Sequence, residues 1–218
     1  MRRHRSTIRA AIGLALIGLP LRGAWGAEGP SFVNDVEPVL TRHGCNAGGC
    51  HGKLAGQNGF RLSLRGFAPE ADHAALVTEE HGRRIGGLDP AASLLLLKAT
   101  GALPHGGGRL FAADSPAADT LRVWIAAGAP GPVADEPRVV GIEVSPAALS
   151  LAPGDARSLA VTATSSDGTT RDVTALARFH SNDASVATVT PGGILRAERP
   201  GEVAVVATYQ GQIGRAHV

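Results

Sequence analysis

The sequence predicts a multidomain protein in which an all-α domain is followed by an all-β sandwich. Apolar residues recur with a helical period before residue 128, and they alternate with polar residues after residue 138. Between these regions lies a stretch rich in Pro and Gly, 128–137, which is typical of a linker without secondary structure. A length of 218 residues also suits two small domains.

The first 26 residues have the pattern of a secretory signal peptide. A basic segment, 2–5, precedes an apolar run, 10–21, and small residues at 24–27 supply a cleavage site. The run has about 12 residues and contains Pro20, whereas a membrane span needs about 18 or more apolar residues. We therefore predict a cleaved signal peptide at 1–26, export to the periplasm or cell envelope, and no integral membrane span after cleavage.

The formal charge of +2 comes from this leader. Without its five arginines the chain has 16 basic and 19 acidic residues, a net charge of −3. The remaining chain therefore lacks the excess of positive charge that is typical of nucleic-acid binding.

Four short helices are expected in the first domain, at residues 31–44, 71–80, 91–99 and 114–127. Ser31 can cap the first helix, and Gly44 ends it. The last helix carries Leu121, Trp124 and Ile125 on one stripe and stops at Gly128. Because the first and last helices both have an apolar stripe, we expect them to pack against each other.

The only two cysteines of the chain stand in the run Cys45-Asn-Ala-Gly-Gly-Cys50-His51. Covalent attachment of haem c needs two thiols, which form thioethers, and a following histidine, which binds the iron. Four residues separate the cysteines instead of the usual two, and the glycines among them can bulge outward. The run predicts one haem c per chain, with His51 as the proximal iron ligand. In the alternative, Cys45 and Cys50 form a disulfide in an oxidising compartment, which gives His51 no role.

The sixth iron ligand is expected to be a histidine. The only methionine is Met1, in the predicted signal peptide, so methionine ligation is excluded. His105 is favoured because the glycines at 106–108 allow the backbone to approach a haem face closely. The alternatives are a five-coordinate iron or ligation by His73 or His81, whereas His43 lies on the proximal side of the motif.

Arginines near the motif could pair with a haem propionate. Arg61 and Arg65 flank an apolar alternation, and Arg83 and Arg84 form a similar pair. For each of them the alternative is a solvated side chain.

Short alternating segments predict the strands of the second domain, at 140–144, 149–151, 159–163, 186–189 and 203–209. Turn residues separate these segments, and several short strands at this spacing favour an antiparallel sandwich.

Residues 31–132 resemble the cytochrome c domains of large planctomycete envelope proteins. The matching stretches are 32–40, 45–52, 58–66, 93–98, 104–108 and 121–130. The resemblance implies an all-α cytochrome c-like haem domain, placed at 27–132, in which His105 stands where related domains carry the distal ligand loop.

Residues 138–212 resemble a group 2 bacterial Ig-like domain, and Phe179 stands where that family usually has Trp. We place the linker at 133–138 and the Ig-like domain at 139–212. The last residues, 213–218, look like a translated sequencing adapter. On that interpretation they are a non-native tail, the Ig-like domain is truncated, and the chain is a fragment of a larger envelope protein.

The favoured function is an exported c-type cytochrome module that exchanges electrons with a redox partner protein in the cell envelope. The Ig-like domain would then be a spacer or docking module. In the alternative, the chain is a cell-surface binding or adhesion protein in which Cys45 and Cys50 form a disulfide. No catalytic set stands out, so we expect an electron carrier rather than an enzyme, although a haem enzyme or gas sensor is a third possibility if His105 does not bind iron.

Overall fold

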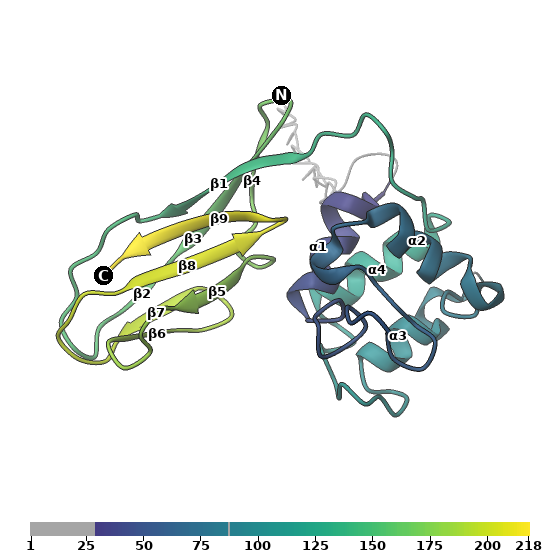
Figure 1. Ribbon diagram of the computed structural model, residues 1–218, viewed down its shortest axis with the longest axis horizontal. Coiled ribbons are helices and arrows are strands. Elements are labelled where there is room, and N and C mark those ends of the chain that lie inside the picture. Colours follow the sequence, from purple (N-terminus) through teal and green to yellow (C-terminus); the bar gives the residue numbers. More distant parts are fainter. Residues whose placement is uncertain (1–28, 87) are drawn as a thin grey trace, which may run out of the picture.

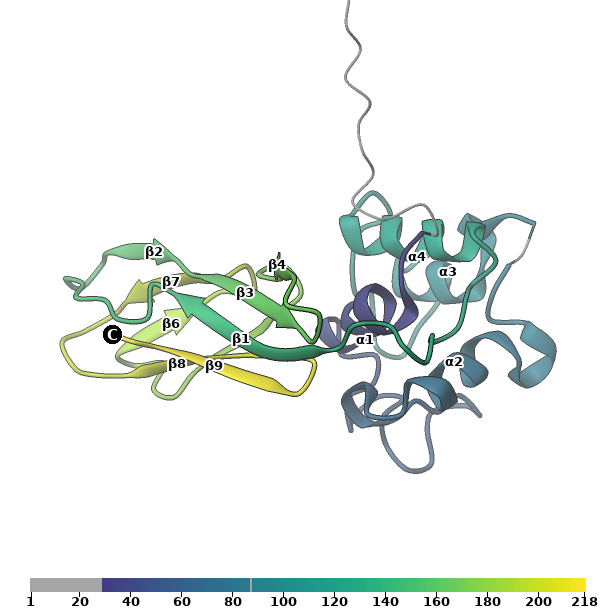
Figure 2. The same ribbon diagram turned by 90° about the horizontal axis from the view of Figure 1, so that it is seen from above.

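The computed structural model describes residues 29–86 and 88–218 (Figure 1). The predicted signal peptide, 1–26, lies outside the described residues. A helical domain and a β-domain lie end to end along the long axis of the molecule, as both views show (Figures 1 and 2). They are joined by residues 127–138, which contain no helix or strand.

The described part of the first domain contains four α-helices: α1 (Glu37–Arg42), α2 (Pro69–Val77), α3 (Leu94–Ala99) and α4 (Pro116–Ala126). A π-helical turn, Phe32–Val36, precedes α1, and 3-10 turns span Leu64–Gly66, Glu79–Gly82 and Pro90–Ala92. The four predicted helices are confirmed, although the third is shorter than expected. Ser93 is extended and caps α3, so it separates α3 from the turn before it.

The first and last helical segments pack against each other, as predicted. The ring centroids of Phe32 and Trp124 are 5.6 Å apart, and the Trp124 indole N–H donates to the Pro130 carbonyl at 2.9 Å. Leu40, Leu76 and Leu121 are fully buried around this pair. The packing fixes α1, and with it the chain that continues into Cys45.

The second domain consists of short antiparallel strands: β1 (Val139–Ser145), β2 (Ala156–Ser158), β3 (Ala160–Ser165), β4 (Thr170–Asp172), β5 (Arg178–Ser181), β6 (Ala187–Val189), β7 (Ile194–Ala197), β8 (Ala204–Tyr209) and β9 (Gln212–His217). They pair as β1-β3-β4, β2-β7-β6 and β5-β8-β9. Val161, Leu195 and Val205 come from three different strands and are buried in one core. Antiparallel pairing is confirmed, and the segments predicted at 140–144, 159–163, 186–189 and 203–209 correspond to β1, β3, β6 and β8. The prediction of a strand at 149–151 is wrong, since the described residues between β1 and β2 contain no strand.

Phe179 stands where the group 2 Ig-like domains that the sequence resembles usually have tryptophan. Gly193 makes room for the Phe179 ring. Gly193 has φ +80°, and a Cβ there would lie 3.1 Å from the Phe179 ring and 2.9 Å from the Leu159 carbonyl oxygen. A side chain at this position would therefore be strained and would displace the phenyl ring.

The boundary that we placed at residue 212 falls at the start of β9. This strand pairs with β8 from Tyr209↔Gln212 to Ala204↔His217, and Ala216 is fully buried. Most of the segment considered as a tail thus lies within the sandwich.

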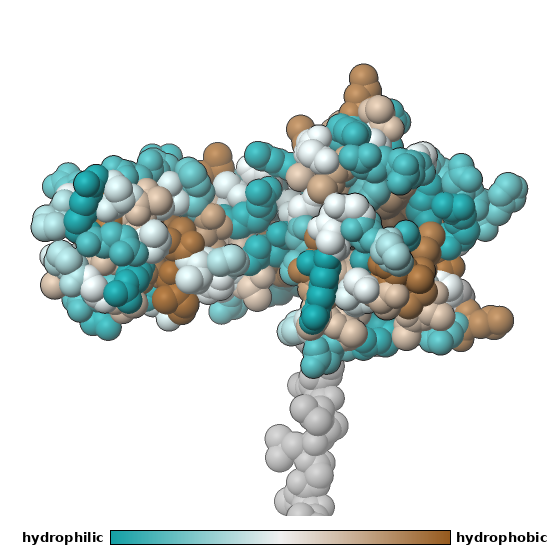
Figure 3. All heavy atoms as spheres, turned by 90° about the horizontal axis from the view of Figure 1, so that it is seen from below, coloured by the Kyte–Doolittle hydropathy of each residue, from teal (hydrophilic) through white to brown (hydrophobic). Residues whose placement is uncertain are grey.

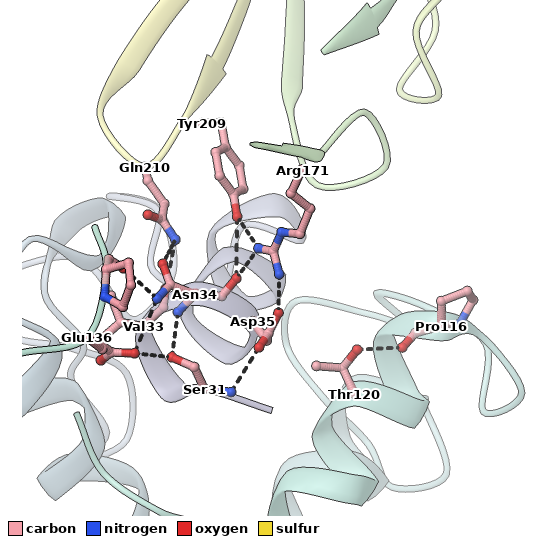
Figure 4. Close-up of polar contacts among 11 residues, drawn as sticks. Ser31, Val33, Asn34, Asp35, Pro116, Thr120, Glu136, Arg171, Tyr209 and Gln210 are labelled. Atoms are coloured by element: carbon pink, nitrogen blue, oxygen red, sulfur yellow. Dashed lines mark hydrogen bonds and ion pairs between the residues drawn. The ribbon is translucent and has the colours of Figure 1, made fainter. Parts of the chain in front are cut away.

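Hydrogen bonds connect the β-domain to the π-helical turn of the helical domain (Figure 4). Arg171 on β4 donates to the Asp35 carboxylate at 2.6 Å, to the Asn34 carbonyl at 2.5 Å and to the Tyr209 hydroxyl at 2.8 Å. Gln210 donates to the Val33 carbonyl at 2.8 Å. The contacts with Val33, Asn34 and Asp35 join residues more than 130 positions apart and hold the two domains in one orientation.

Glu136 adds hydrogen bonds between the linker and the helical domain. Its carboxylate accepts hydrogen bonds from the Ser31 hydroxyl at 2.5 Å and from the Asn34 amide at 3.2 Å. The end of the linker is thereby held against the start of the helical domain.

We expect Arg171→Met to loosen the domain orientation. The variant loses three hydrogen bonds, but the arginine side chain is about half exposed, so the stability loss is expected to be only about 1 kcal/mol. Small-angle X-ray scattering is expected to show a broader distribution of interdomain distances. Arg157→Met, on exposed β2, is the matched control. If the scattering profile of Arg171→Met is identical to that of the unmodified chain, then Arg171 does not hold the domain orientation.

Candidate functional site

The segment Cys45–Gly52 is coiled tightly after α1. The Cys45 N–H donates to the Leu40 carbonyl at 2.9 Å, and the His51 N–H donates to the Cys45 carbonyl at 3.0 Å. A Cβ at Gly52 would lie 2.0 Å from the Asn46 carbonyl oxygen, so only glycine fits there. The four residues between the cysteines form part of this coil. The coil places both thiols and His51 on the same cavity.

Cys45, Cys50, His51 and His105 line one cavity of about 300 Å³. This volume lies at the lower end of the range for ligand pockets, about 300–1,000 Å³. Leucines from several segments and one aromatic ring form the apolar part of the wall: Leu40, Leu62, Leu76, Leu94, Leu95, Leu110 and Phe60. The cavity therefore combines an apolar wall with two thiols and two imidazoles.

The imidazoles of His51 and His105 face each other across this cavity. Their ring centroids are 6.2 Å apart and their planes differ by 9°. A metal ion held about 2 Å from one nitrogen of each ring would keep the ring centres about 6 Å apart. The distance between the ring centres thus matches two histidines on one metal ion, and the stacked rings would have to turn so that a nitrogen of each points at that ion.

Hydrogen bonds orient both rings in the same way. Nδ1 of His51 lies 3.0 Å from the Phe60 carbonyl oxygen, and Nδ1 of His105 lies 3.0 Å from the Gly108 carbonyl oxygen. A carbonyl oxygen only accepts, so each Nδ1 carries the proton and each Nε2 keeps its lone pair. Metal-binding histidines commonly donate their other ring N–H to a carbonyl oxygen in this way.

The other candidate histidines lie outside the cavity. His73 Nε2 lies 2.9 Å from the Ala129 carbonyl oxygen and its ring packs against Phe32, while His43 packs against Phe111. His81 is exposed in the turn Glu79–Gly82. Of the histidines considered as a partner for His51, the structure brings His105 to it.

The basic residues at the cavity are not the pair that we favoured from the sequence. Arg61 and Arg65 do not line it, whereas Arg83, Arg84 and Lys98 do. Arg84 is buried, donates to the carbonyls of Ala75 at 2.6 Å and Gly59 at 3.0 Å, and stacks on the Phe60 ring. Buried arginines are rare, but burial of Arg84 depends on tertiary packing that the sequence does not reveal.

Both cysteines are free thiols in the structure. Burial, and then the neighbouring Cys50, raise the pKa of Cys45 to about 12. Cys45 is therefore a neutral thiol at physiological pH, enclosed in the cavity wall.

A buried carboxyl group supports the cysteine segment from behind. Glu37 Oε1 accepts from the Asn46 amide at 2.8 Å, and Oε2 has no hydrogen-bond partner among the described residues. Burial, and then the charge of Asp72, raise the pKa of Glu37 from 4.5 to about 8. Glu37 is thus mostly protonated at neutral pH.

We expect the stability of the helical domain to fall as the pH rises from about 4.5 to about 8. The folded chain binds the Glu37 proton more tightly than the unfolded chain, so its stabilising contribution is fully present below pH 4.5 and is lost through pH 8. Glu37→Gln is expected to flatten this dependence and to raise the free energy of unfolding at pH 9 by on the order of 2 kcal/mol. Urea denaturation at pH 4.5 and pH 9 measures both values. Glu70→Gln, on the exposed side of α2, is the control. If the free energy of unfolding of Glu37→Gln still falls with rising pH as in the unmodified chain, then other groups cause the dependence.

Within residues 29–86 and 88–218, no three or more His, Cys, Asp or Glu residues cluster as a metal site. A haem iron takes only one or two ligands from the protein. In the same residues, no helix is long and apolar enough to cross a membrane.

Comparison with known families finds a match to the bacterial Ig-like domain (group 2) at residues 138–216. Comparison with curated proteins finds no match. The matched residues coincide with the antiparallel β-domain, from the residue before β1 to the last buried residue of β9. Domains of this family occur in extracellular and cell-surface proteins. Residues 138–216 of the chain therefore form a group 2 bacterial Ig-like domain.

Proposed function

We propose that the helical domain binds one haem c covalently and serves as an electron-transfer module in the cell envelope. The observation that carries this proposal is the convergence of Cys45, Cys50, His51 and His105 on one apolar cavity. The parallel imidazoles, each with Nδ1 bonded to a carbonyl, add to it.

Each residue has a definite task in this proposal. Cys45 and Cys50 would form the thioethers, and His51 and His105 would hold the iron through their Nε2 atoms. When bound, haem c supplies a one-electron Fe(III)/Fe(II) couple. An iron held by two histidines would have no site for a substrate, which favours electron transfer over catalysis.

The basic residues of the cavity suit the carboxylates of a haem. Arg83, Arg84 and Lys98 line the cavity, and no Asp or Glu of the described residues does so. The buried charge of Arg84 is met mainly by carbonyl oxygens, since its nearest carboxylate, on exposed Glu79, is 3.8 Å away. We assign the propionates to this side, in place of Arg61 and Arg65.

The Ig-like domain is compatible with a spacer or an adhesion role. In our proposal it holds the haem domain at a fixed orientation, through Arg171 and Gln210, while a redox partner docks elsewhere. Export by the N-terminal leader would place the chain in the periplasm or at the cell surface.

The test is expression of the full chain with periplasmic export and a cytochrome c maturation system. We expect a red protein whose pyridine haemochrome spectrum shows a c-type α band, and whose haem stays with the polypeptide through acid-acetone extraction. Colourless protein, or haem that is fully extracted, would overturn the proposal. Colourless protein with Cys45 and Cys50 joined would instead favour the surface-binding alternative.

A further inference from the structure

A groove of about 950 Å³ runs between the two domains, on a different part of the molecule from the cysteine cavity. One wall is formed by α1, the turn Leu64–Gly66 and Phe67. The other wall is the outer face of β5 and β8, where Arg178 pairs with Thr208 and His180 with Val206. The contacts of Arg171 and Gln210 with the π-helical turn keep the two walls apart at a fixed spacing (Figure 4).

The groove carries positive charge that the protein does not neutralise. Arg65, Arg138 and Arg178 line it together with His180. Within the described residues, Arg65 and Arg178 make no ion pair, and Arg138 reaches a carboxylate only at 4.0 Å.

A further feature keeps the groove positive. Of the described residues that line the groove, only Glu37 has a carboxyl group, and that group is buried and mostly protonated at neutral pH.

Exposed apolar side chains also lie along the rim of the groove. Phe67 is 79% exposed and Leu64 is 48% exposed on its rim. Leu176 and Val206 continue the apolar lining on the side of the Ig-like domain. Figure 3 shows several separate hydrophobic patches on the face of the molecule that it draws. Exposed apolar side chains gathered in a cleft mark interaction sites.

We propose that this groove binds an acidic, amphipathic peptide segment of a partner protein. Carboxylates of the segment pair with Arg65 and Arg178, and its apolar side chains cover Phe67 and Leu64. Arg65 and Arg178, which make no ion pair within the described residues, lie beside the exposed Phe67 and Leu64, and this combination favours a segment that carries both carboxylates and apolar side chains. Neither domain alone forms the site. In this proposal the interdomain contacts of Arg171 therefore hold the two walls of the binding site in place. The proposal does not depend on haem.

The test uses the full chain and a fluorescein-labelled peptide of alternating Glu and Leu, followed by fluorescence anisotropy. We expect saturable binding that weakens with salt, as charge pairing requires. Arg178→Glu and Phe67→Ser are each expected to weaken binding at least tenfold. Arg157→Glu, on β2 outside the groove, is the charge-matched control and should bind like the unmodified chain.

Arg178→Gln is a milder variant in case charge reversal disturbs the fold, and it should still weaken binding about threefold. Equal binding by the Arg178 variants and the unmodified chain, or no saturable binding of the peptide, would overturn the proposal. Tighter binding of heparin or of a single-stranded oligonucleotide than of the peptide would also overturn it, in favour of another polyanion. Because the measurement needs no haem, it can fail while the haem proposal stands, and the reverse also holds.

Discussion

Replacing His51 by alanine is expected to abolish stable haem incorporation during maturation. His51 follows Cys50 directly, and its Nε2 is free because Nδ1 is bonded to the Phe60 carbonyl at 3.0 Å. Without this ring, the cavity lacks the histidine that follows Cys50 in the motif and that we propose as an iron ligand, and we expect the haem content per polypeptide to fall at least tenfold. The measurement is the ratio of haem absorbance to protein after purification.

Two comparisons make this prediction specific. His180→Ala removes a histidine of the Ig-like domain and should leave the haem content unchanged. His105→Ala should keep the covalent haem, since both thiols and His51 remain, but the native spectrum should change from low-spin to high-spin. Normal haem content in His51→Ala, or a native spectrum unchanged in His105→Ala, contradicts the roles assigned to the two rings.

Local signals in the sequence were sufficient to place the helices and four of the strands, β1, β3, β6 and β8. Ser31 and Ser115 accept hydrogen bonds from backbone N–H groups three residues later, which is the interaction that helix caps make. The alternating segments formed strands because one face of each is buried in the sandwich. These features depend on neighbouring residues and on polarity, both of which a single sequence displays.

Contacts between distant residues could not be read in the same way. Nothing near Arg171 in the sequence indicates that it pairs with Asp35, 136 positions away. Arg84 and Arg65 have similar local surroundings, yet folding buries Arg84 at the cavity and places Arg65 at the groove. The candidate site could therefore be predicted where the motif fixes it, at Cys45, Cys50 and His51, while its charged surroundings required the tertiary structure.

Trp124→Ala is expected to destabilise the helical domain by about 3–5 kcal/mol, a large part of the stability of about 5–15 kcal/mol that folded domains have. Trp124 is fully buried, packs against Phe32 and donates its indole N–H to the Pro130 carbonyl at 2.9 Å. Truncation leaves a cavity between the first and last helical segments and removes the partner of a carbonyl. Loss of ellipticity at 222 nm during urea denaturation measures the effect, because the helices lie in this domain.

Val123→Ala is the matched control for this variant, since Val123 is the preceding residue of α4 and is 37% exposed. It should cost less than about 1 kcal/mol. The Ig-like domain has its own core, around Val161 and Leu195, so its strands should remain folded when the helical domain of Trp124→Ala unfolds. If both domains instead unfold together in the variant, then the contacts of Arg171 and Gln210 contribute much more to stability than their exposure suggests. If the two variants unfold at the same urea concentration, the core is not centred on Trp124, and the fixed placement of α1 and of Cys45 must have another source.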